Sequence, residues 1–252
     1  MSKNLIKPAL IRKDSVGSTN EEAFLLFEGG ATAPFFVTAD FQTAGRGRSG
    51  RIWDSPKGNL YLSALLENPA SIDKLPQLGF VAGVALIDAL VTVAQSSCFH
   101  LKWPNDVLVD GAKLAGILLE TRSIRGKQAV VIGWGVNIVE FPKNLPYRAI
   151  DLPTITPTAD LDPLRQQLMK SFSERLMLWD RGDNFDEIRD LWLQFALSPG
   201  MPLVIRTGET QNVEGVFETI DHDGALILKT KNGSQRILAG DVILPEAQQG
   251  AA

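Results

Sequence analysis

The chain has 252 residues, 44% of them hydrophobic and 21% charged, and a formal net charge of −4. This composition is typical of a globular protein with one sizeable core and room for a small second domain, and the acidic balance excludes a global basic field directed at nucleic acid. The single cysteine, Cys98, excludes a disulfide framework within the chain; with no signal-peptide core and no apolar run of roughly 18 residues, we expect a cytoplasmic protein.

Alternation of apolar residues and the placement of turn residues predict the elements of the first part of the chain. Residues 17–30 predict a helix that Ser18 or Thr19 caps. Strands are expected over 34–42 and 58–67, and a buried helix over 75–95. Three further strands follow, over 102–109, 114–120 and 129–138, and an Asp-Gly turn joins the first two of these in a tight hairpin.

The last third of the chain changes its pattern twice. Residues 162–197 predict two amphipathic helices. After the Ser-Pro-Gly step at 198–200, short strands separated by turn residues predict a small β-barrel of about 50 residues. We therefore expect two domains, residues 1–197 and residues 198–252.

The segment Gly45–Arg51 has the glycine spacing of the dinucleotide-binding pattern G-x-G-x-x-G. A dinucleotide site needs those glycines to open a helix, but Pro56 follows too closely for a helix to form. Arg46, Arg48 and Arg51 instead place three permanent charges where guanidinium groups can bind phosphate or carboxylate oxygens. Their mutual repulsion predicts a loop that stays disordered until an anion binds.

A second group of polar residues lies on the predicted hairpin. Lys113 opens an otherwise apolar strand, where an ammonium group can bind phosphate as a point charge. Gly116 within that strand, and Asn137 after two glycines, indicate the close approach of a ligand or of another backbone segment. The other polar residues of the hairpin are Lys102, Asn105 and Asp106. Together these residues predict a cleft for an anionic, nucleotide-like ligand.

The order of the motifs GSTN, QTAGRGRSGRIW, GNLYLS, KWPNDVLVDGAKLAGILLE and GWGVNI resembles that of the biotin protein ligases, and the likeness continues through GALIL and AGDVIL. The resemblance implies an α+β fold. Residues 1–197 would form a catalytic domain, with a mixed or antiparallel sheet flanked by helices as in class II synthetases, and residues 198–252 an SH3-like β-barrel. It also implies an ATP-dependent ligase that makes biotinoyl-5′-AMP and transfers biotin to a lysine of a biotin carboxyl carrier protein.

The same resemblance implies roles for single residues. The expected catalytic residues are Lys113, Arg48 and Asp106, the last as an orienting group or base in the transfer to lysine. The residues expected to bind biotin are Ser18, Thr19, Asn20, Gln42, Arg46, Gly47, Arg48, Lys113 and Gly116. Those expected to bind ATP and the adenylate are Arg51, Trp53, Asn105, Asp106 and Asn137. We expect Mg²⁺ to be held mainly through ATP phosphates, with no metal site of the protein's own.

The sequence leaves other classes of protein as alternatives. A lipoate protein ligase would share the fold and the adenylation chemistry, but the arginine-rich loop and the barrel favour biotin. A nucleic-acid-binding protein or a non-catalytic scaffold fits less well, given the acidic net charge and the polar hairpin. Only 17 residues precede Ser18, too few for a helix-turn-helix module, so we expect no DNA-binding role and no membrane partner. A homodimer stays open.

Overall fold

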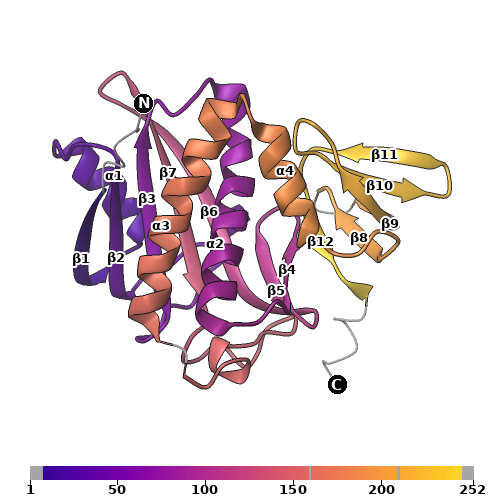
Figure 1. Cartoon of the computed structure of the whole chain (residues 1–252), viewed down its shortest axis with the longest axis horizontal. Helices are drawn as coiled ribbons and strands as arrows, with labels where there is room; N and C mark the ends of the chain where they lie inside the picture. The colour runs from indigo at the N-terminus through magenta and orange to yellow at the C-terminus, as the bar shows by residue number, and fades with distance from the viewer. Residues whose placement is uncertain (1–7, 159, 209–210, 246–252) are drawn as a thin grey trace.

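The computed structural model describes residues 8–158, 160–208 and 211–245. A seven-stranded sheet with the order β1-β2-β3-β7-β6-β5-β4 forms its larger part (Figure 1). The strands are β1 (Ala9–Val16), β2 (Phe35–Gln42), β3 (Leu60–Glu67), β4 (Phe99–Lys102), β5 (Asp106–Val109), β6 (Ala112–Ile124) and β7 (Lys127–Val136). Only the β1–β2 pairing is parallel, so the expected mixed sheet is confirmed.

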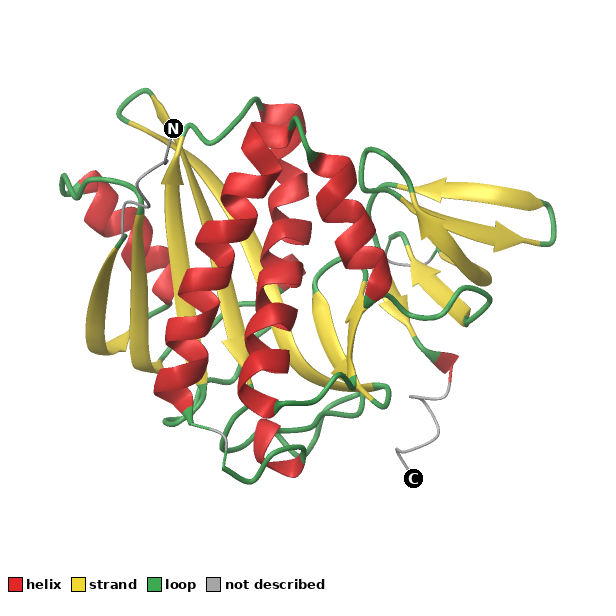
Figure 2. Cartoon of the chain, in the orientation of Figure 1, coloured by secondary structure: helices red, strands yellow, loops and turns green. Residues whose placement is uncertain are grey.

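Helices cover both faces of this sheet. On one face, α1 (Thr19–Glu28) packs against β2, β3 and β7. On the other face, α2 (Leu78–Ala94) and α3 (Leu161–Trp179) lie side by side, as Figure 2 shows in red. A shorter helix, α4 (Phe185–Gln194), contacts α2 and leads to the C-terminal sheet. The α+β class is therefore confirmed.

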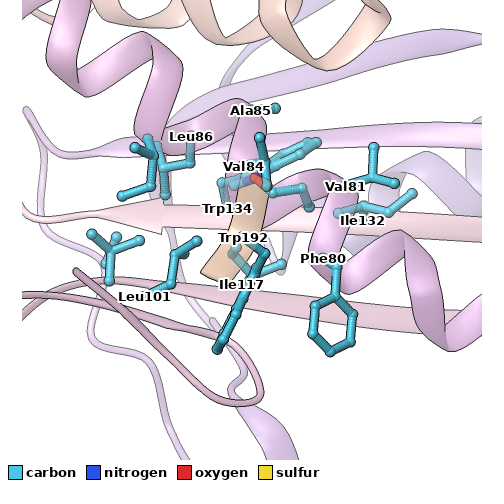
Figure 3. Close-up of a cluster of buried hydrophobic side chains, with 14 of the residues drawn as sticks. Phe80, Val81, Val84, Ala85, Leu86, Leu101, Ile117, Ile132, Trp134 and Trp192 are labelled. Atoms are coloured by element: carbon cyan, nitrogen blue, oxygen red, sulfur yellow. The ribbon is translucent and has the colours of Figure 1, made fainter. Parts of the chain in front are cut away.

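The core lies between the sheet and the helices α2 and α3. Figure 3 shows apolar side chains of α2 packed against Trp134 of β7. The helical stretch Ile72–Ala94 does reach the length and hydropathy of a membrane span, contrary to the expectation that no such run exists. However, 67% of its most apolar window is buried within the fold, which is the behaviour of a core helix.

One prediction about strands is wrong. Residues 102–109 form the end of β4, a turn and β5 rather than a single strand, because Pro104 has no N–H for the ladder and Asn105 N–H donates back to Lys102 O at 3.1 Å. The turn places Lys102 opposite Asp106 in the β4–β5 ladder. The predicted Asp-Gly hairpin turn is confirmed, with positive φ angles of 49° and 76° at Asp110 and Gly111.

The small C-terminal domain is confirmed as a five-stranded antiparallel sheet with the order β11-β10-β9-β8-β12. Its strands are β8 (Pro202–Arg206), β9 (Asn212–Ile220), β10 (Leu226–Thr230), β11 (Gly233–Ile237) and β12 (Asp241–Ile243). Trp103 Nε1 donates to Gly224 O at 3.0 Å, and Lys102 Nζ donates to Val242 O at 3.1 Å. The first bond holds the β9–β10 turn, and the second holds β12, beside the β4–β5 hairpin. The proposed boundary at residue 198 lies between α4 and β8 and stays a prediction.

Candidate functional site

Three glycines open a hollow in the sheet face that α1 covers. Gly133 and Gly135 of β7 alternate with residues that point into the core, and Gly135 lies opposite Gly116 of β6. Because these positions have no side chains, the sheet offers a floor of bare backbone to a ligand. We call the space above this floor, about 50 Å³ in volume, the deep pocket.

Buried polar groups at the start of α1 form one wall of the deep pocket. Thr19 N–H donates to Gln42 Oε1 at 2.8 Å, and Gln42 Nε2 donates to Ser55 Oγ at 2.8 Å. The Asn20 side chain accepts from Ser63 Oγ at 2.6 Å. Each amide group is therefore held in one orientation, which gives a ligand a fixed pattern of donors and acceptors.

Trp53 lies directly on the glycine floor. A Cβ atom at Gly135 would come within 2.6 Å of the Trp53 ring, and one at Gly116 within 3.2 Å. The remaining volume holds about one or two water molecules. A larger ligand can enter only when Trp53 and its loop move away.

The arginine-rich loop around Trp53 is folded, contrary to the expected disorder before an anion binds. It contains a short 3-10 turn, η1 (Arg48–Gly50), and each of its three arginines meets a carboxylate. Arg46 Nη2 lies 3.2 Å from Glu21 Oε2, while Arg51 Nη2 lies 2.9 Å from Asp241 Oδ1. Arg48 shares Asp241, at 3.4 Å, and also donates to Gly240 O at 3.1 Å. These acidic partners offset the repulsion on which the expectation of disorder depended.

Asp106 is held between two lysines where the deep pocket opens outward. Its carboxylate oxygens lie 2.8 Å from Lys102 Nζ and 2.6 Å from Lys113 Nζ, and the residue is only 9% exposed. Burial by itself would raise the pKa of Asp106, but the charges and hydrogen bonds of both lysines hold that pKa well below its usual range. The Lys113 ammonium also lies 5.3 Å from the Trp53 ring centroid and 5.6 Å from that of Tyr147.

A cavity of about 560 Å³ lies beyond this ion pair, and we call it the anion cavity. Its cationic lining residues are Arg48, Arg51, Lys102, Lys113, Arg148 and Arg206. The acidic residues in its lining are Asp106 and Asp241. Trp53, Asn105 and Lys113 line both spaces, so the deep pocket and the anion cavity meet at these side chains. Once Trp53 and its loop move away, one ligand with a small polar head and a phosphorylated end can occupy both.

The structure brings together all but two of the residues predicted for the site. Those that line the deep pocket are Ser18, Thr19, Asn20, Gln42, Arg46, Trp53, Asn105, Lys113 and Gly116. Those that line the anion cavity are Arg48, Arg51, Trp53, Asn105, Asp106 and Lys113. Gly47 and Asn137 line neither space: Gly47 N–H donates to Arg51 O at 2.7 Å within the loop, and Asn137 Nδ2 donates to Ile150 O at 3.1 Å behind Lys113.

Sequence reasoning missed several residues of the site. Gly133 and Gly135, the two glycines before Asn137, gave the signal of close approach, but Asn137 was assigned to the site in their place. Asp241 and Arg206 gave no such signal, since both come from the C-terminal domain and reach the site only through the packing of β12 and β8 beside the β4–β5 hairpin.

Residues 14–137 match the sequence family described as the biotin/lipoate A/B protein ligase family, and residues 204–244 match the biotin protein ligase C-terminal domain. Over 234 residues the chain is 37% identical to a biotin–[acetyl-CoA-carboxylase] ligase of Paracoccus denitrificans, covering 89% of this chain and 96% of that relative. It is 32% identical to the bifunctional ligase/repressor BirA of Bacillus subtilis, covering 93% of this chain and 74% of BirA. A solved structure of biotin protein ligase from Aquifex aeolicus, in complex with biotin and ATP, matches with a TM-score of 0.80 and 30% identity, covering 93% and 97% of the two chains.

Proposed function

Because this chain belongs to the biotin/lipoate A/B protein ligase family, we propose that its cleft activates biotin with ATP, forming biotinoyl-5′-AMP and pyrophosphate, and then transfers biotin to a lysine of a biotin carboxyl carrier protein. It is an ATP-dependent biotin–protein ligase. The observation that carries the proposal is the meeting of the deep pocket and the anion cavity at Lys113. A carboxylate held in one space there faces a phosphate held in the other.

Adenylation brings two anions into contact. The biotin carboxylate forms a bond to the α-phosphorus of ATP, and the bond from that phosphorus to the departing pyrophosphate breaks. Most of the barrier comes from charge repulsion and positioning, so fixed cations are the principal catalytic groups. We assign Lys113 and Arg48 to the reacting phosphate and carboxylate, and Arg51 to the departing phosphates. Arg206 lies in the same cavity and supplies a further cation.

The deep pocket is assigned to the head group of biotin. Thr19 and Gln42, joined by hydrogen bonds, supply a fixed donor and acceptor pattern for a ureido group. Ser18, Asn20 and the backbone at Gly116 complete its wall and floor. Closing the arginine-rich loop over the product would keep water from the reactive mixed anhydride.

In the second step a carrier lysine amine attacks the acyl carbon, and AMP leaves with its phosphate. The depressed pKa of Asp106 makes its carboxylate a weak proton acceptor. We therefore assign Asp106 the orienting role, in which it holds Lys102 and Lys113 in place. Asn105 and Trp53 stay assigned to the adenylate. Asn137 is assigned an indirect role, in which its side-chain amide holds the backbone behind Lys113.

Mg²⁺ would arrive with ATP and be held through its phosphate oxygens. Across the ranges of the chain that the structure describes, no group of three or more histidine, cysteine or acidic side chains forms a metal site. Two acidic residues line the anion cavity, and both are paired with cations. When bound, the metal would supply further charge neutralisation on the phosphates.

The names of the relatives support a carboxylase as the owner of the carrier protein. We propose a cytoplasmic location, which a chain with one cysteine suits. A homodimer stays a prediction.

The direct test is isotope exchange between pyrophosphate and ATP, measured separately with biotin and with lipoate as the only acid. We expect exchange that depends on biotin and little or none with lipoate. Exchange with lipoate alone would establish the alternative ligase, and exchange with neither acid would end the proposal.

Replacing Arg48 by alanine should weaken retention of the adenylate about tenfold or more, since a charge-assisted hydrogen bond is worth roughly 1.5–3 kcal/mol. The released intermediate is measured as free biotinoyl-AMP during turnover. Arg236→Ala is a suitable control, because Arg236 pairs with Asp221 and Asp223 on the C-terminal domain and lines neither space of the site. Unchanged retention in Arg48→Ala would remove Arg48 from its assigned role.

Replacing Gly133 by alanine should abolish biotin binding while the protein stays folded. The new Cβ would collide with Oδ1 of Asn20 and push that side chain out of the deep pocket. Gly126→Ala is not a fair control because Gly126 has a positive φ, whereas Gly79→Ala adds a methyl group in open space. Calorimetric titration with biotin measures the affinity. A normal affinity in Gly133→Ala would contradict the prediction.

A further inference from the structure

Lys102 stands at the end of β4, on the wall of the anion cavity, and no step proposed above gives it a task of its own. Its ammonium group lies 2.8 Å from Asp106 Oδ2 and donates to Val242 O at 3.1 Å. The Lys102 side chain is 17% exposed, close to the 18% of Lys113. Lys102 is therefore a mostly buried cation with fixed partners, unlike a solvated surface lysine.

Lys102 and Lys113 divide the carboxylate of Asp106 between them. Oδ2 lies 2.8 Å from Lys102 Nζ and Oδ1 lies 2.6 Å from Lys113 Nζ, so each oxygen faces one ammonium group. Although burial raises the pKa of Asp106, the charges of both lysines hold that pKa well below its usual range, and the carboxylate is ionised at neutral pH. The three side chains together therefore have one positive charge in excess.

This excess charge matters because the proposed reaction uses Lys113 as a cation. If Asp106 were the partner of Lys113 alone, the two would form a neutral pair. An approaching phosphate would be attracted by the ammonium group and repelled by the carboxylate over nearly the same distance, so most of the attraction would cancel. Lys102 offsets the carboxylate from its other side. The net positive charge then acts in the anion cavity, which all three side chains line.

We infer that Lys102 is a positioning residue for adenylation, which neutralises Asp106 and so leaves the charge of Lys113 to the reacting phosphate. The inference rests on the proposed function, in which Lys113 meets that phosphate. It divides the work between the two partners of Lys113. Asp106 fixes the place of the Lys113 ammonium group, and Lys102 prevents the carboxylate from cancelling the charge that it holds in place.

The second contact of Lys102 joins this cluster to the C-terminal domain. Val242 lies on β12, the edge strand of the five-stranded sheet, and its carbonyl accepts from the same ammonium group that faces Asp106. A loss of activity on replacing Lys102 therefore has two explanations, which are lost charge and lost contact with β12. A third is direct contact between Lys102 and the phosphates, since Lys102 lines the anion cavity. The experiment has to separate the first explanation from the other two.

The experiment measures biotin-dependent exchange between pyrophosphate and ATP in Lys102→Gln and in the double variant Lys102→Gln/Asp106→Asn. Glutamine removes the charge but keeps an N–H donor. We expect exchange at saturating substrates to be about 10²-fold slower in Lys102→Gln, the scale found when one charge-stabilising group is lost. The double variant also removes the carboxylate, which returns the excess charge to Lys113. It should exchange within about tenfold of the wild-type rate, although it too lacks Lys102 and the ammonium contact with β12.

The matched control combines Lys127→Met with Glu67→Gln, because these residues form an exposed lysine–carboxylate pair on the same sheet, at 2.8 Å. This control should exchange pyrophosphate at the wild-type rate. Urea unfolding of each variant shows that it is folded. The comparison of the double variant with wild type also stands alone, should Lys102→Gln fail to fold.

Two results would overturn the inference while leaving the proposed function intact. The first is a rate in Lys102→Gln close to that of wild type, which would show that the charge of Lys102 is not needed. The second is a double variant about 10²-fold or more below wild type, which would assign Lys102 to direct contact with the phosphates or with β12. A wild-type protein that shows no exchange with biotin would instead contradict the proposed function.

Discussion

Replacing Lys113 by methionine should lower the rate of biotin-dependent pyrophosphate exchange by about 10³-fold, the scale found when one preorganised charge-stabilising group is removed. Lys113 lines both the deep pocket and the anion cavity, whereas Arg46 lines the first alone and Arg48 and Arg51 the second alone. Methionine keeps much of the side-chain length and removes the ammonium group. Initial exchange rates at saturating biotin and ATP provide the measurement.

The control for this change is Lys127→Met, which removes an exposed lysine of β7 that pairs with Glu67. That variant should exchange pyrophosphate at the wild-type rate. An exchange rate in Lys113→Met within about tenfold of wild type would show that binding and the arginines suffice for adenylation.

Replacing Asp106 by asparagine should lower the free energy of unfolding at neutral pH by about 3 kcal/mol, because Lys102 and Lys113 lose their shared counter-charge in a nearly buried site. The folded pKa of Asp106 lies below its ordinary value of 3.8, so its contribution is complete above that value and is lost as the pH falls through the lower folded pKa. The difference between wild type and variant should therefore be largest at neutral pH and shrink below about pH 4. Urea unfolding at several pH values measures it.

Asp223→Asn serves as the comparison, because Asp223 pairs with Arg236 in an exposed position of the C-terminal domain and should cost little. A difference between Asp106→Asn and wild type that does not change with pH would contradict the charge-based account. Transfer of biotin from preformed adenylate tests the orienting role separately: transfer at the normal rate would exclude Asp106 from the second step.

Much of the fold could be predicted from local pattern. The helix over 17–30, the alternating strands and the Asp-Gly hairpin are set by residues close in sequence, and all are present. The division of residues 102–109 into two strands could also have been read from Pro104, which cannot donate to a ladder. The buried helix predicted over 75–95 is confirmed as α2, although burial between a sheet and a helix requires the same composition as a membrane span.

The site was predictable where one motif carries its own chemistry, as in the arginine-rich loop and at Lys113. What local sequence could not supply was the set of partners across domains. The prediction that the loop is disordered was wrong, because Asp241, almost 200 residues away in the chain, pairs with Arg48 and Arg51.

The anion cavity has six cationic side chains and two acidic ones within a protein whose formal net charge is −4. At physiological ionic strength the field of such a cluster is screened within about 8 Å, so it acts inside the cavity and little beyond its mouth. A compact polyanion that fits within the cavity is drawn in over that last distance, and its rate of association should depend on salt. An acidic protein can thus concentrate cationic side chains around one cavity and attract a compact polyanion there.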